Sequence, residues 1–154
     1  MQLTLNICQR ALRSMQCEIG RYPTVETGGI LLGYVSETEL KIVEAIDGGY
    51  KKVIREAGRF RYDIEYVEHL CEIISTLYSP PLELVGVWHK HNHSDSPMFS
   101  YEDCNIHHEL LSITQHKICS ILFQKQPNNL SEYAMHTYIV SGASICNEIV
   151  AEII

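Results

Sequence analysis

The stretch VGVWHKHNHSDSPMFSYED, residues 85–103, combines the features that decide the fold and the chemistry of this chain. Its first residues are an apolar run typical of a buried strand, and the polar residues after it are typical of a loop. His89 and His91 alternate at strand spacing, so both imidazoles are expected on one face of that strand. With Asp103 they make a His/His/Asp set, and a catalytic zinc site has that form, with a fourth position left to water. A His-x-His pair by itself is more often surface polarity.

Ser100 and Asp103 have the S-x-x-D spacing of a capping box that opens a helix. A buried helix face follows at Ile106, Leu110 and Ile113. Capping alone accounts for the serine and the aspartate, because a first-turn carboxylate is favoured near the positive end of the helix dipole. The same spacing also sets both side chains on one helix face, where the carboxylate could complete a metal site.

The rest of the chain alternates between helical and strand-like periodicity. Asp63 is expected to cap the central helix. Residues 47–60 are expected to form a loop, with a short strand near 59–62. The predicted helices cover residues 3–19, 64–78 and the segment from Ser100, and the predicted strands cover 26–34, 38–46, 82–88, 117–125 and 132–140. Residues 143–154 fit a docked strand or helix. This order predicts an α/β fold of the α+β type, with one mixed sheet flanked by helices in a single domain over residues 1–154.

Composition limits the partners and the compartment. The net charge of −7 argues against nucleic acid or an anionic membrane as the main partner, because no basic stripe is present. No apolar run reaches transmembrane length, and the N-terminus lacks the layout of a signal peptide. The six cysteines are scattered without a C-x-x-C pair, which fits a reducing compartment. We therefore expect a soluble cytoplasmic protein. The sequence indicates no oligomeric state.

Three pieces of the sequence together resemble the JAB/MPN family of zinc peptidases, whose JAMM motif combines a remote Glu with H-x-H and S-x-x-D. The first piece, ETGGILLG, begins at Glu26 and matches the family's first-strand signature. The second, GVWHKH, contains His89 and His91, and the third, FSYED, contains Ser100 and Asp103. The three pieces span residues 26–103. The resemblance implies a JAB/MPN-like layering, similar to that of cytidine deaminases, and one Zn²⁺ per chain held by His89, His91 and Asp103.

The resemblance also implies roles in hydrolysis. Glu26 is then the general base, which takes a proton from the attacking water and passes it to the leaving amine. Ser100 donates a hydrogen bond to the developing oxyanion. The substrate class implied is an amide or isopeptide bond at the C-terminus of a ubiquitin-like protein or a small sulfur-carrier protein. The sequence does not separate these two substrates.

The chain departs from the family pattern after the second histidine. Residues 92–99 make the spacer one residue longer than usual, and Asn92 stands where the family commonly has Pro. The longer spacer allows a second register in which His93 is a metal ligand. The Gly-x-Trp-His frame favours His89 and His91, and loop polarity is then the default for His93.

Two other classes of function compete with a JAMM peptidase. A non-catalytic MPN-type scaffold or protein-binding module is the main alternative, although the complete motif argues against it. A nucleobase deaminase would need P-C-x-x-C and a zincin would need H-E-x-x-H, and neither is present. His107 and His108, beyond the motif, are expected on a solvated helix surface.

Overall fold

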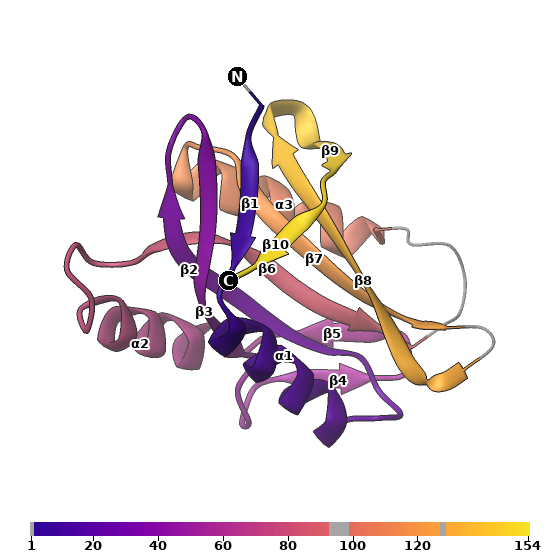
Figure 1. Ribbon diagram of the computed structural model, residues 1–154. Helices are drawn as coiled ribbons and strands as arrows, with labels where there is room; N and C mark the ends of the chain where they lie inside the picture. The colour runs from indigo at the N-terminus through magenta and orange to yellow at the C-terminus, as the bar shows by residue number, and fades with distance from the viewer. Residues whose placement is uncertain (1, 93–98, 127–128) are drawn as a thin grey trace.

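The computed structural model describes residues 2–92, 99–126 and 129–154, and these form a mixed α+β fold (Figure 1). The helices are α1 (Gln9–Arg21), α2 (Ile64–Ser75) and α3 (Tyr101–Thr114), with a short 3-10 turn, η1 (Gly142–Ser144). The strands are β1 (Thr4–Ile7), β2 (Thr27–Val35), β3 (Glu39–Asp47), β4 (Ile54–Glu56), β5 (Arg59–Arg61), β6 (Glu83–His91), β7 (Ile118–Gln126), β8 (Asn129–Ser141), β9 (Ile145–Glu148) and β10 (Ala151–Ile153).

Within the described residues, one curled sheet takes up eight of the strands, in the order β10-β1-β3-β2-β6-β7-β8-β9. Strands β4 and β5 form a separate hairpin. The β1–β10, β1–β3 and β6–β7 pairs are parallel, whereas β2–β3, β2–β6, β7–β8 and β8–β9 are antiparallel. The prediction of one mixed sheet flanked by helices is therefore confirmed.

The three helices cover opposite faces of the sheet. On β2, Leu31 packs in the core beneath α1, whereas Ile30 and Leu32 pack with α2. On β6, Trp88 belongs to the α1 core and Val87 to the core beneath α3. Because side chains alternate along a strand, α1 covers one face while α2 and α3 share the other.

Strand β6, helix α3 and the parallel strand β7 form a β-α-β unit that creates the site. Asp103, in the first turn of α3, faces His89 and His91 near the carboxyl end of β6. The region outside the carboxyl ends of parallel strands is where α/β sheets commonly place their ligands. The unit therefore brings Asp103 of α3 next to His89 and His91 of β6.

Two sequence predictions about local structure are confirmed at helix starts. The Asp63 carboxylate accepts a hydrogen bond from the Tyr66 backbone N–H and so caps α2. The capping box at Ser100 is complete. The Ser100 side-chain oxygen accepts a hydrogen bond from the Asp103 backbone N–H, and the Asp103 carboxylate accepts one from the Ser100 backbone N–H.

Other expected boundaries are wrong. Residues 4–7 form strand β1 rather than the first turn of α1, because they pair with both β3 and β10. The C-terminal segment, for which the sequence allowed a strand or a helix, contributes strands β9 and β10. The expected loop at 47–60 includes β4, which pairs with β5.

Across the described ranges no helix is long and apolar enough to cross a membrane. All six cysteines are free thiols.

A buried ion pair ties the β4–β5 hairpin to helix α1 and strand β2. The Arg55 guanidinium donates to the Glu18 carboxylate at 2.9 Å and to the Thr27 hydroxyl at 3.0 Å. The Arg55 and Glu18 side chains are only 9% and 5% exposed. Arg55 also lies over the Tyr22 ring, 4.1 Å from its centroid. A buried pair of this kind is sensitive to the loss of one partner, because the remaining charge is left desolvated.

We expect Arg55→Met to lower the free energy of unfolding by about 3–5 kcal/mol, because it leaves the Glu18 carboxylate buried without its cation. Urea denaturation followed by circular dichroism measures the change. The matched control is Glu18→Met combined with Arg55→Met, which removes both charges and should recover most of the loss. Equal stability of the single and double variants would contradict the importance of the pair.

Candidate metal centre

His89 and His91 lie at the C-terminal end of β6, where this strand pairs with β2 and β7. The register pairs His89 with Gly28 of β2 and with Leu122 of β7, so it is fixed from both sides. The Nε2 atoms of His89 and His91 lie 2.9 Å apart. His89 is buried and the His91 side chain is 16% exposed. The alternation predicted from the sequence therefore brings both imidazoles to the α3 face of the sheet.

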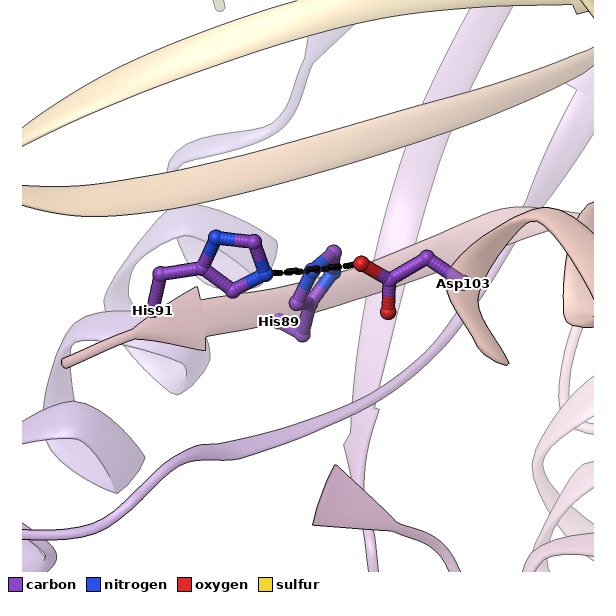
Figure 2. Close-up of side chains that lie close together, drawn as sticks. All are labelled: His89, His91 and Asp103. Carbon is purple, nitrogen blue, oxygen red and sulfur yellow. Dashed lines mark hydrogen bonds and ion pairs between the residues drawn. The ribbon is translucent and has the colours of Figure 1, made fainter. Parts of the chain in front are cut away.

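Asp103 completes the group from the first turn of α3, as Figure 2 shows. Its Oδ2 atom lies 3.3 Å from Nε2 of His89 and 3.4 Å from Nε2 of His91. The same oxygen accepts the Ser100 backbone N–H at 2.7 Å, which fixes its direction. The capping and metal-ligand interpretations of Asp103 are thus compatible, since one carboxylate serves both.

The three donors fit a single small cation. His89, His91 and Asp103 each offer one ligand atom, and these atoms all lie within 4.8 Å of one another. A tetrahedral zinc site with bonds of about 2.0–2.1 Å has donor separations of about 3.3 Å. The two nitrogen–oxygen separations match this value, and the nitrogen–nitrogen separation is slightly shorter. Two histidines and one carboxylate also suit ferrous iron, so the donor set predicts a metal and measurement decides which one.

The electrostatics of Asp103 favour its ionised form. Burial by itself raises the pKa of this carboxyl. The charge and hydrogen bond of His89, the hydrogen bond of His91 and the Ser100 backbone N–H outweigh burial and hold the pKa well below its ordinary value. A permanently ionised carboxylate beside two imidazoles is the state in which these groups bind a cation.

Glu26 is one residue away from the strand ladder that carries His89. It directly precedes β2, where Thr27 pairs with Lys90 and Gly28 with His89. Glu26 is buried, and its backbone N–H donates to the Glu56 carbonyl of β4 at 2.7 Å. It is not one of the three clustered metal donors. A buried carboxylate that is not a metal donor remains available for another role.

Gly28 is needed for the close approach of β2 to the metal strand. A Cβ at this position would lie 2.8 Å from both Cα and Cβ of His89, closer than real Cβ contacts allow. Gly28 therefore leaves the space that the His89 side chain occupies. A glycine inside a strand commonly marks such a close approach of two backbones.

Ser100 is placed at the N-cap, with its side-chain oxygen accepting the Asp103 N–H at 3.1 Å. A hydroxyl has one donor and two acceptor sites, so this bond leaves its hydrogen free to donate. Ser100 is exposed. It can therefore cap the helix and still donate to a bound molecule.

The expectation that His107 lies on a solvated surface is wrong, whereas His108 is exposed. His107 is 1% exposed, and its Nε2 lies 2.9 Å from the Ser120 hydroxyl of β7. Burial lowers its pKa to about 4, so it is neutral at pH 7. Its spacing of one turn after Asp103, between the half-buried Ile106 and the buried Leu110, is the sequence signal that could have revealed it. The alternative ligand His93 lies outside the described residues.

We expect Asp103→Asn to weaken zinc binding by more than about 100-fold, because losing even an outer-shell partner of a metal site costs 10–100-fold. The asparagine oxygen can still accept the Ser100 N–H, so α3 should remain folded. Competition with a chromophoric chelator measures affinity, and circular dichroism measures helix content. His69→Ala, which removes an exposed histidine on α2, is the control. Undiminished affinity in the Asn variant would leave Asp103 as a helix cap alone.

Comparison with known proteins gives a fold neighbour and no family. No family model matches the chain, and no curated protein matches it. Among solved structures, the chain is similar to the solution structure of protein DSY2949 from Desulfitobacterium hafniense, with a TM-score of 0.65 and 11% sequence identity. The match covers 97% of this chain and 92% of that chain. The similarity shows that the whole chain shares a known fold, and the function must be argued from the site.

Proposed function

We propose that this protein is a zinc-dependent metallopeptidase of the JAB/MPN type. In this proposal it hydrolyses an amide or isopeptide bond at the C-terminus of a ubiquitin-like or sulfur-carrier protein. The observation that carries the proposal is the convergence of His89 Nε2, His91 Nε2 and Asp103 Oδ2 beside the buried Glu26. Three residues of the JAMM-like motif, His89, His91 and Asp103, meet at one end of β6, and Glu26 directly precedes the strand that pairs with β6 there. A JAB/MPN-like layering agrees with α1 on one face and α2 and α3 on the other.

The ligand set suits a catalytic rather than a structural zinc site. Three protein ligands are characteristic of catalytic zinc, whereas structural sites are closed by four. His89, His91 and Asp103 are the metal-binding residues in this proposal. Zinc held there would supply Lewis acidity, which makes water a better nucleophile at neutral pH and polarises the scissile carbonyl.

Glu26 and Ser100 have the surroundings that the two catalytic roles require. Glu26 holds a carboxylate in a buried position next to β6, where it can take a proton from water and return it to the leaving amine. Ser100 keeps a hydroxyl hydrogen that can donate to the oxyanion as the carbonyl is attacked. Neither role displaces a metal ligand.

A groove beside the metal centre is large enough for an extended peptide tail. It has a volume of about 510 Å³ and lies between β5 and the start of α2 on one side and α3 on the other. Two of its apolar lining residues, Tyr101 and Ile64, are 83% and 60% exposed. Phe60 and Ile106 line this groove and also the small pocket that contains His89 and Asp103. A flexible C-terminal tail lying in the groove would lead to the metal centre.

The proposal is tested by cleavage of linear and isopeptide-linked fusions of ubiquitin-like and sulfur-carrier proteins. We expect the zinc-loaded parent to cleave at least one of them and Glu26→Gln to bind zinc equally while losing turnover by about 100-fold or more. Elemental analysis checks that each protein contains about one zinc per chain. Full activity of Glu26→Gln would remove the general base, and iron in place of zinc would contradict the chemistry. A zinc-free, inactive parent would favour the scaffold alternative.

The groove predicts a separate effect on substrate binding. We expect Tyr101→Ala to raise KM by about 10-fold with little change in kcat, because it removes apolar area that contacts substrate away from the reacting atoms. Steady-state kinetics on a cleaved fusion measures both constants. Ile113→Ala is the control. The sequence wrongly placed Ile113 on the buried face of α3; it is 71% exposed and does not line the groove. Equal KM for the two variants would remove the groove from substrate binding.

A further inference from the structure

Two side chains that flank His91 hold the segment that carries Glu26. This segment, the connector (residues 22–26), joins α1 to β2. The Lys90 ammonium donates to the Tyr22 carbonyl, and the Asn92 side-chain amide donates to the Thr24 carbonyl at 2.7 Å. Both bonds join positions 68 residues apart in the sequence. Strand β6 therefore contacts the connector from the residues immediately before and after a metal donor.

Lys90 is unusual because it is fully buried at 0% exposure. Side chains alternate along β6, so Lys90 points to the α1 face while His89 and His91 point to the α3 face. Its ammonium also lies 5.4 Å from the centroid of the Tyr133 ring. Burying a lysine is unfavourable, and the hydrogen bond to the Tyr22 carbonyl offsets part of the lost hydration. A buried charge that contacts the backbone ahead of Glu26 suggests a positioning role.

Asn92 adds a second bond in the middle of the connector, to the Thr24 carbonyl. It occupies the position at which the resembled family commonly has Pro, and a proline there has no side-chain donor. Thr24 is two residues before Glu26, and the Glu26 N–H is itself bonded to the Glu56 carbonyl. The connector is thus held by Lys90 of β6, by Asn92 just after β6, and by one backbone bond from β4.

We propose that Lys90 and Asn92 are positioning residues that fix the Glu26 carboxylate beside the metal donors. This inference rests on the proposed function for its catalytic consequence, and on the contacts to Tyr22 and Thr24 for its structural part. A general base must be held within hydrogen-bond reach of the proton that it takes, and misplacement by about 1 Å can cost about 100-fold in rate. A looser connector would therefore lower turnover without removing a metal ligand.

The test uses Lys90→Met and Asn92→Ala in the full chain, with hydrogen exchange of the Glu26 amide as the first readout. We expect exchange at this amide to increase by about 5- to 10-fold, the equivalent of one lost hydrogen bond, while the amides of β7 stay protected. Tyr34→Phe is the matched control, because it removes a side-chain bond to the Pro80 carbonyl away from the site. Unchanged exchange in both variants overturns the inference.

The second readout separates positioning from general stability. We expect kcat to fall by about 10-fold in each variant, with KM and zinc affinity unchanged and the Tm of Lys90→Met not lowered, since a methionine suits the buried space. Asn92→Gln, which keeps an amide donor, should recover part of the loss. Faster exchange with unaltered kcat overturns the positioning role. If the parent cleaves no fusion, the peptidase proposal fails, while the exchange data still decide whether the two side chains hold the connector.

Discussion

The antiparallel pairing of β2 with β6 is the constraint on which the rest of the site depends. Gly28 lies opposite His89, and a side chain at that position would collide with the histidine backbone and Cβ. The absence of a Cβ lets the two strands form their full ladder under the imidazole. One strand then carries two metal donors, and the other begins one residue after Glu26. A change in this register would separate the carboxylate from the metal donors.

Strand β6 uses its two faces for different purposes. One face presents His89 and His91 to α3, where the capping box directs Asp103 toward them. The other face buries Trp88 and Lys90 beneath α1. The indole N–H of Trp88 donates to the Ile46 carbonyl, and Lys90 donates to Tyr22. Buried polar atoms on this second face are thus satisfied by backbone carbonyls, which join β6 to β3 and to the connector.

Buried polar side chains near the candidate site pair with one another. Glu18 and Arg55 neutralise each other under the connector, and His107 is neutral against Ser120. Asp103 is held ionised by the two histidines and a backbone N–H. The Asp103 carboxylate and the two imidazoles thus lie together as a group that could hold a cation. The fold neighbour at 11% identity shows that such an architecture occurs with a very different sequence, so a function must be argued from the side chains and not from the fold.

The sequence by itself determined the features that depend on neighbours a few residues apart. The alternation of His89 and His91, the capping box at Ser100 and the cap at Asp63 are local, and all three occur as predicted. Long-range contacts decided the rest. Residues 4–7 are a strand because β3 and β10 pair with them, and His107 is buried because β7 packs against α3. The partners of Lys90 and Arg55 lie 68 and 37 residues away, and only tertiary packing determines which distant groups can compensate a buried charge.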